Sequence, residues 1–236
     1  MSDAVEKFFR AYYACFAPQR IPLSPTTPRE MLARVEPDNS GYVEWRLTPQ
    51  GDKAVDLAPL ETVVGIPLPP SFKAWFTRYY TLDMDCSIVR LPECPSNNPL
   101  GPLKVIMTAS HAFSTIPRQL GLIPFGEESN DVGPLCFDAR QPKTDGEWPI
   151  VYWDHELDTK PRAIGPTIFS NFEKLIECVT YYLEGGKTLE QREKRIAGFF
   201  EIDPVGAGAH GKRYWSSRLS EMKPLPWWKS LFKELQ

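Results

Sequence analysis

The sequence predicts an α+β fold: a mainly antiparallel sheet packed by helices, with helical extensions at the N- and C-terminal ends. Segments with helical hydrophobic spacing lie towards both ends of the chain, and between them three candidate strands follow one another at 120–125, 134–139 and 149–154. Loops connect these strands, and consecutive strands joined in this way usually pair antiparallel. Helices, then strands, then helices is an order typical of α+β proteins.

Residues 1–55 are the predicted N-terminal extension. A helix with an aromatic face is expected at 3–17, because apolar side chains recur there at helical intervals: Val5, Phe8, Phe9, Tyr12 and Phe16. Pro18 should end this helix. A short helix is expected at 28–35, and a strand at 42–47, where apolar and polar residues alternate.

The predicted core, residues 56–186, begins with two helices. Apolar residues at Leu57, Leu60 and Val64 mark the first helix, and Gly65 is suited to end it. A Pro-Pro pair opens the second helix, because proline is tolerated in the first helical turn. The buried face of this second helix is predicted to be aromatic, with Phe72, Trp75, Phe76 and Tyr79.

In the later parts of the core, the spacing of apolar residues predicts secondary structure in some segments and not in others. A strand is predicted at 86–91 and a loop at 92–102, whereas the pattern of 103–118 predicts neither a helix nor a strand. After the three strands, Ser170 and Glu173 predict a capping box. The helix that follows should end at Gly185-Gly186 and bury one apolar face: Phe172, Leu175, Ile176, Val179 and Leu183.

Residues 187–236 are the predicted C-terminal extension, and the three parts are expected to form one compact unit. Thr188 and Gln191 predict a second capping box, which opens a helix to about Phe200. The glycine-rich segment 203–211 is interpreted as a flexible loop. A short amphipathic helix is expected at the end of the chain, from the spacing of Trp228, Leu231, Phe232 and Leu235.

Composition restricts the partners and the compartment. A formal net charge of −3 argues against nucleic acid as a direct partner. The five cysteines are an odd number without a Cys-x-x-Cys pair, which favours free thiols in a reducing compartment. The N-terminus has neither the basic nor the apolar part of an export signal, and no segment has the length of a membrane span. We therefore expect a cytoplasmic protein with no membrane partner.

The few motifs that could carry chemistry are weak. In Asp154-His155-Glu156 the two carboxylates would share one face of a strand while His155 points to the other, so a metal site there is disfavoured. Ser110-His111 with Ser114 lacks the Gly-x-Ser-x-Gly turn of a nucleophile elbow. Cys136 is expected to be buried and inert. We expect no catalytic residue, no metal and no cofactor.

Charge is unevenly distributed along the chain. Residues 121–160 contain nine acidic and three basic residues, a net charge of −6, and most of the acidic residues fall in the loops and strand ends of the predicted sheet. Two interpretations are open. The acidic side chains could form a solvated face that keeps the protein soluble. They could instead form an acidic surface that speeds the approach of a basic partner and sets its orientation.

Several segments together resemble the SUKH superfamily. They are Leu60–Phe76 with its Gly-Ile-Pro-Leu-Pro turn, Leu122–Gly126, Leu135–Asp138, the strand at 149–153 and the helix from Phe169. The resemblance covers about 56–184 and rests on structural residues. That superfamily includes bacterial immunity proteins of polymorphic toxin systems and fungal regulators of cell-wall synthesis. The resemblance implies a sheet packed by helices and no enzymatic activity.

The resemblance, the missing export signal and the acidic loops predict an immunity protein. It would bind and neutralise a cognate toxin of bacterial competition in the cytoplasm, and a nuclease is the expected toxin. Carboxylates would take the place of phosphates on a basic nuclease surface, and tryptophans would anchor the centre of the contact. The expected contact residues are Glu127, Glu128, Asp131, Asp145, Glu147, Trp148, Trp153, Asp154 and Glu156.

The sequence also allows other interpretations. One is an intracellular interaction scaffold with several partners and no toxin, similar to the fungal regulators. Another is an enzyme that uses Asp154, His155 and Glu156. The sequence also leaves open whether the protein acts as a monomer or as a homodimer.

Overall fold

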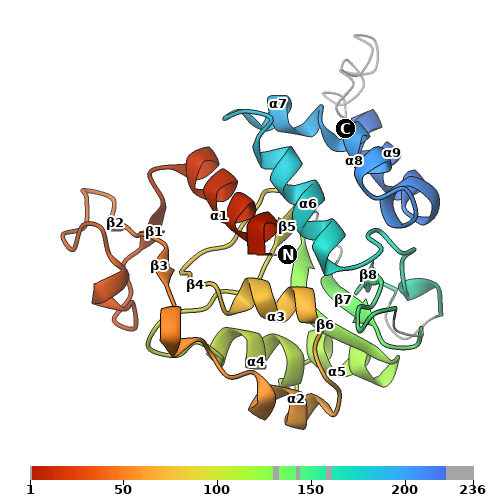
Figure 1. The fold of residues 1–236 in the computed structure, drawn as a ribbon, viewed down its shortest axis with the longest axis horizontal. Coiled ribbons are helices and arrows are strands. Elements are labelled where there is room, and N and C mark those ends of the chain that lie inside the picture. Colours follow the sequence, from red (N-terminus) through yellow and green to blue (C-terminus); the bar gives the residue numbers. More distant parts are fainter. Residues whose placement is uncertain (1, 130–132, 142–143, 158–160, 222–236) are drawn as a thin grey trace, which may run out of the picture.

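The computed structural model describes residues 2–129, 133–141, 144–157 and 161–221. Its centre is a four-stranded antiparallel sheet in the order β5-β6-β7-β8, and helices cover both faces of this sheet (Figure 1). The α+β class predicted from the sequence is therefore confirmed. The strands are β5 (Val89–Arg90), β6 (Leu122–Glu128), β7 (Pro134–Asp138) and β8 (Ile150–Tyr152).

The apolar side chains of the sheet lie in two clusters, one on each face of the sheet. Ile123 pairs with Phe137, and both belong to the main core; Cys136 pairs with Val151, and both belong to a smaller cluster on the other side. Successive side chains of a strand point to opposite faces, which explains the division. A bulge in β6 lies between Pro124 and Gly126. A Cβ on Gly126 would lie 2.7 Å from the carbonyl oxygen of Arg90, so glycine permits the close approach of β5.

Three predicted helices cover the main core: α1 (Ser2–Phe16), α3 (Pro70–Phe76) and α6 (Phe172–Leu183). Figure 1 shows α1 and α6 side by side above α3. Phe72 of α3 is buried at the centre, with its ring centroid 5.9 Å from Phe125, 5.5 Å from Phe137 and 5.0 Å from Phe172. Edge-to-face contacts of this kind stabilise the core beyond the stabilisation that comes from burial of the rings. The predicted helix before α3 is also present, as α2 (Ala58–Val64), and it ends at Gly65 in a left-handed conformation.

Two helices occupy the segment for which the sequence predicted neither helix nor strand. They are α4 (Gly101–Thr108) and α5 (Ala112–Gln119). Pro102 lies in the first turn of α4, where proline is tolerated. Pro117 lies inside α5, so a residue that usually interrupts a helix obscures this one. Ile116 of α5 packs on the smaller cluster. This cluster contains Leu122, Cys136, Val151, Trp153 and Ala163.

One pair of short strands lies within the N-terminal extension, and a second pair ties the extension to the core. β1 (Arg20–Pro22) pairs with β2 (Tyr42–Glu44), and β3 (Thr48–Pro49) pairs with β4 (Tyr79–Tyr80). Two predictions here are wrong in extent. The expected helix at 28–35 is only one 3-10 turn, Arg29–Met31, and the strand expected at 42–47 ends at Glu44. Tyr79 belongs to β4 and not to the preceding helix, which ends at Phe76.

The C-terminal extension folds as short helices: α7 (Leu189–Glu193), a 3-10 turn (Ile196–Gly198), α8 (Phe199–Ile202) and α9 (Lys212–Glu221). The capping box of Thr188 and Gln191 is confirmed, but the single helix expected to reach Phe200 is interrupted. Asn171 caps α6, and the predicted box of Ser170 is wrong. The helix predicted at 228–235 lies outside the described residues.

Asp203 explains the correction at Ser170 and a further one in the segment 203–211. Its carboxylate accepts the backbone N–H groups of Ser170 at 2.7 Å and Gly206 at 3.0 Å, and the hydroxyl of Ser170 donates to it as well. Ser170 is therefore unavailable as a cap for α6. The segment expected to be a flexible loop is instead a π-helical turn, Gly206–His210, in which Gly206 and Ala207 are buried.

One core joins the three predicted parts of the chain. Phe8 from the N-terminal extension, Phe72 from the central part and Trp215 from the C-terminal extension belong to the same buried cluster. All five cysteines are free thiols. Among the described residues, no helix combines the length and apolar character needed to cross a bilayer.

Candidate functional site

Three of the predicted contact residues are inside the protein. Trp148 packs in the main core and Trp153 in the smaller cluster, so neither indole reaches the surface where a partner would bind. Glu128 is buried at the end of β6, where Arg218 and Tyr214 of α9 bind its carboxylate. The expectation that these three side chains form a contact surface is therefore corrected.

Some of the predicted acidic residues are accessible but have structural roles. Glu147 is half-buried and accepts hydrogen bonds from the backbone N–H of Ser71 at 2.8 Å and from its hydroxyl at 2.7 Å. Asp154 accepts the backbone N–H of Glu156 at 3.0 Å within a turn. Asp145 and Glu156 are exposed, and Asp145 has a left-handed backbone with φ of 54°. Asp131 lies outside the described residues.

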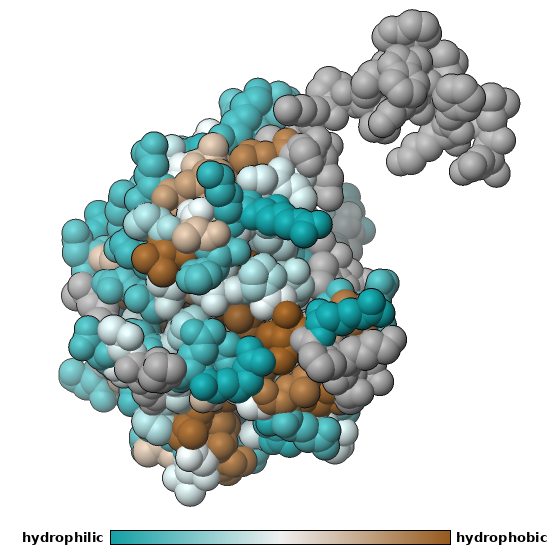
Figure 2. All heavy atoms as spheres, turned by 90° about the vertical axis from the view of Figure 1, so that its right-hand side faces the viewer, coloured by the Kyte–Doolittle hydropathy of each residue, from teal (hydrophilic) through white to brown (hydrophobic). Residues whose placement is uncertain are grey.

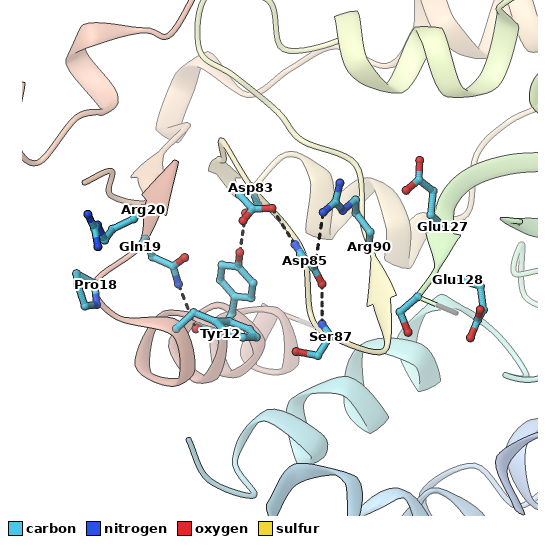
Figure 3. A pocket seen from close by; sticks show the side chains of 12 residues that line it. Tyr12, Pro18, Gln19, Arg20, Asp83, Asp85, Ser87, Arg90, Glu127 and Glu128 are labelled. Carbon is cyan, nitrogen blue, oxygen red and sulfur yellow. Dashed lines mark hydrogen bonds and ion pairs between the residues drawn. The ribbon is translucent and has the colours of Figure 1, made fainter. Parts of the chain in front are cut away.

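Glu127 and Glu128 are the predicted contact residues that line a cavity, and of the two only Glu127 is exposed. This acidic cavity has a volume of about 600 Å³ and lies between the end of α1, β1, the turn at 83–87 and the adjoining ends of β5 and β6 (Figure 3). Its charged lining comprises Arg20, Asp83, Asp85, Arg90, Glu127 and Glu128. Figure 3 shows the carboxylates of Glu127 and Glu128 extending in different directions from β6.

The turn at 83–87 holds its shape through its own acidic side chains. Asp83 accepts the backbone N–H of Asp85 at 3.1 Å, and Asp85 accepts that of Ser87 at 2.8 Å. Ser87 has a left-handed backbone, with φ of 70°, and its hydroxyl accepts a hydrogen bond from the Arg192 guanidinium at 3.2 Å. From α1, the hydroxyl of Tyr12 donates to the carbonyl of Asp83 at 2.8 Å. The wall is therefore anchored from two helices.

Negative charge exceeds positive charge in this cavity. Arg20 forms an ion pair with Asp38, and Glu128 is neutralised by Arg218. With those two ion pairs accounted for, Arg90 is the cation that lies among the carboxylates of Asp83, Asp85 and Glu127. Its Nη2 is 3.1 Å from Asp85 Oδ2, and Glu127 is its pairing partner between β5 and β6. The hydrogen bond that Arg90 donates to Asp85 is the main reason that the pKa of Arg90 is raised.

Glu93 adds a further carboxylate from a neighbouring cavity of about 760 Å³, which shares Asp83 and Arg90 with the acidic cavity. Burial raises the pKa of Glu93, and the charges of Asp83 and Glu127 raise it further, against the opposing effect of Arg90. The acidic side chains therefore repel one another, and a positively charged ligand would relieve that repulsion.

A second cavity, here called the apolar cavity, adjoins on the other side of Glu127 and has a volume of about 490 Å³. Its apolar lining comes from Val105, Ile106, Phe113 and Pro134, and its other lining residues are His111, Ser114, Gly126, Glu127, Glu128 and Gly133. The Phe113 ring stands 6.0 Å from the ring of Trp153 and 5.2 Å from that of His155, between centroids. Sequence reasoning missed this cavity because its helices lie in the segment without a clear pattern.

The motifs considered for catalysis have other partners in the structure. Ser114 is buried, and its hydroxyl donates to the carbonyl of Ile106 at 2.7 Å, while His111 Nε2 is 3.5 Å away. The serine thereby joins α5 to α4. Cys136 is buried, and burial raises its pKa well above the ordinary value. No group of three or more His, Cys, Asp or Glu side chains able to hold a metal ion occurs within the described ranges.

Comparisons with known proteins add no relative to this description. No family model matches the sequence, and no curated protein and no solved structure matches the chain.

Proposed function

We propose that this protein is a cytoplasmic immunity protein that binds and neutralises a basic toxin, and that the acidic cavity forms the centre of the contact. The excess of carboxylates around Arg90 is the observation that carries the proposal. The resemblance of the sequence to the SUKH superfamily supports it. A nuclease domain is the proposed toxin.

The electrostatics fit a nuclease partner. A nuclease binds phosphates with clustered Lys and Arg side chains, and Asp83, Glu93 and Glu127 present negative charge in a concave surface. Complementary charge accelerates encounter, and close charge pairs slow dissociation. The partly buried position of Glu93 strengthens its interaction with a cation, because solvent screens such a group less than an exposed one.

The contact surface differs from the one expected from the sequence. Glu127 keeps its proposed role, whereas Asp83, Asp85 and Glu93, which lie outside the acidic segment 121–160, join it. Trp148 and Trp153 are removed because both are buried. Long-range pairing of β5 with β6 brings the two acidic groups together.

Binding of the purified protein to the basic domain of the toxin encoded beside its gene tests the proposal. Glu127→Lys should weaken the complex at least about tenfold, as expected for loss and reversal of a close charge pair. Glu201→Lys, an equal charge change at an exposed residue of α8 that lines neither the acidic nor the apolar cavity, is the matched control and should change affinity little. Affinity should also fall as the salt concentration rises.

Two results would contradict this function. The first is unchanged binding by Glu127→Lys together with Glu93→Lys. The second is recovery of many unrelated proteins in a pull-down without one tight basic partner, which would favour the interaction scaffold.

A further inference from the structure

We infer that the apolar cavity is the second half of the same contact, and that it takes an apolar side chain of the partner that lies next to a Lys or Arg side chain in the acidic cavity. This inference rests on the proposed function and deepens it by naming the chemistry of the partner segment.

The apolar cavity brings together two exposed apolar side chains. Phe113 is 44% exposed and Val105 is 56% exposed, and they come from the neighbouring helices α5 and α4. Figure 2 shows apolar atoms grouped in the lower half of the face to which α5 and β8 contribute. Exposed apolar groups gathered at a cavity with a polar rim are typical of an interaction site.

The aromatic side chain in this cavity is held in place from behind. Phe113 packs edge-on against the buried ring of Trp153 and also contacts the ring of His155. An ordered aromatic ring loses little conformational entropy when a partner binds, which is a property of interface anchors. Trp153, expected from the sequence to be the anchor itself, supports the residue that is exposed.

Charge complementarity identifies the occupant. Glu127 and Glu128 line both cavities, and Arg218 neutralises Glu128. A segment that fills the apolar cavity therefore brings its neighbouring residue beside the carboxylate of Glu127. An acidic neighbour would be repelled, whereas a Lys or Arg would be attracted. The partner segment is therefore an apolar residue adjacent to a cation.

The same charges disfavour a second copy of this chain as the occupant. In a two-fold symmetric dimer each surface faces its own equivalent. An interface centred on the apolar cavity would then bring Glu127 and its acidic neighbours close to their counterparts. Like charges placed in this way oppose association.

The two cavities contribute differently to binding. The acidic cavity supplies attraction that salt weakens, and the apolar cavity supplies burial that salt does not weaken. Basic proteins that lack the apolar neighbour would bind only at the acidic cavity, and weakly. The apolar cavity is thus the part that selects one basic partner among many.

Blocked dipeptides provide a direct test with the full-length chain. Acetyl-Leu-Arg-amide, acetyl-Ala-Arg-amide and acetyl-Leu-Glu-amide are titrated to about 10 mM while amide shifts are followed by NMR. We expect Leu-Arg to shift the amides of Val105, Phe113 and Gly126 and to bind about tenfold more tightly than Ala-Arg, from burial of the larger side chain. Leu-Glu should not bind.

Variants locate the effect. Phe113→Ala and Val105→Ala should each reduce the preference for Leu-Arg over Ala-Arg while shifts around Arg90 and Glu127 persist. Val63→Ala is the matched control, because Val63 is 58% exposed on α2 and lines neither cavity. It should leave the preference unchanged.

The outcomes distinguish this inference from the function on which it rests. Equal binding of Leu-Arg and Ala-Arg at the acidic cavity would overturn the inference and leave the proposed function standing. The absence of any shift around Arg90 and Glu127 with either arginine peptide would overturn both. A dimer in sedimentation analysis that Phe113→Ala abolishes would assign the apolar cavity to a second copy, and would also overturn the inference.

Discussion

Arg218 and Glu128 form an ion pair inside the protein: Nη1 of the arginine lies 2.6 Å from Oε1 of the glutamate, and their side chains are 8% and 0% exposed. A second guanidinium nitrogen donates to Ser129 at 3.1 Å, and the hydroxyl of Tyr214 donates to Glu128. These contacts fasten α9 to the end of β6. The neighbouring residue on that strand, Glu127, lines both cavities, so the C-terminal extension supports the contact surface.

Arg218→Met should lower the free energy of unfolding by about 3–5 kcal/mol, because Glu128 would be left buried without its cation. Combining it with Glu128→Leu should recover much of the loss, since the pair is then replaced by apolar groups. Urea denaturation measures both. Arg213→Met, at an exposed residue of the same helix, is the control and should change stability by less than about 0.5 kcal/mol. Equal destabilisation by Arg213→Met would show that the ion pair is not responsible.

Asp203→Asn should destabilise the protein by about 2–3 kcal/mol, because a buried acceptor that serves several donors would present an amide N–H₂ to them. The affected groups are the backbone N–H of Ser170 and Gly206, each within 3.0 Å of an Asp203 carboxylate oxygen. Chemical denaturation of Asp203→Asn and of the exposed control Asp52→Asn gives the comparison. A loss below about 0.5 kcal/mol for Asp203→Asn would contradict the assigned role.

Glu93→Gln should stabilise the protein at neutral pH. The pKa of Glu93 is raised in the folded protein by burial and by Asp83, so the ionised side chain costs stability as the pH rises through its folded pKa. Below the ordinary glutamate pKa of about 4.3 the side chain is protonated in both states, and the cost is absent. The melting temperature of the variant should therefore exceed that of the wild type at pH 7, and the difference should vanish near pH 3.5.

Glu190→Gln is the opposite control for that measurement. The hydrogen bond from Lys194 lowers the pKa of Glu190, so its ionised form is favoured by folding. Removing the charge should give no gain at pH 7. A similar gain from both substitutions would indicate a general effect of net charge and would contradict the role assigned to the acidic cavity.

One cysteine should react with a thiol reagent before the others. Cys15 is half-buried, whereas Cys86, Cys94, Cys136 and Cys178 are buried. Burial raises the pKa of Cys15 and raises that of Cys94 to about 12, and the thiolate is the reactive form. With Ellman's reagent at pH 8, we expect one slow reaction in the native protein, lost in Cys15→Ser, and five reactive thiols in denaturant. More than one early reaction in the native protein would contradict the burial of the other four.

Local patterns predicted those parts of the fold that depend on neighbouring residues alone. The aromatic spacing of α1, the glycine that ends α2 and the proline pair that opens α3 predicted helices that the structure contains. The same reasoning failed for α5, because Pro117 lies inside a helix that packing against the smaller cluster stabilises. Such packing is not visible in the sequence.

The candidate site shows the same division. Local sequence identified Glu127 as part of an acidic segment but did not show that Glu127 is exposed while Glu128 is buried. Glu128 is buried because it faces α9, where Arg218 binds it. It also gave no reason to join Asp83 and Glu93 to Glu127, because strand pairing between distant segments makes that connection.

By itself, the sequence determined the α+β class, the antiparallel pairing of the consecutive strands β6, β7 and β8, and the helices with regular apolar spacing. The physical reason is that hydrophobic periodicity and capping act within a few residues. Only the tertiary structure decided which charges remain exposed and which aromatic ring reaches the surface. Burial depends on what other segments cover, and here α9 covers Glu128 while Phe113 covers Trp153.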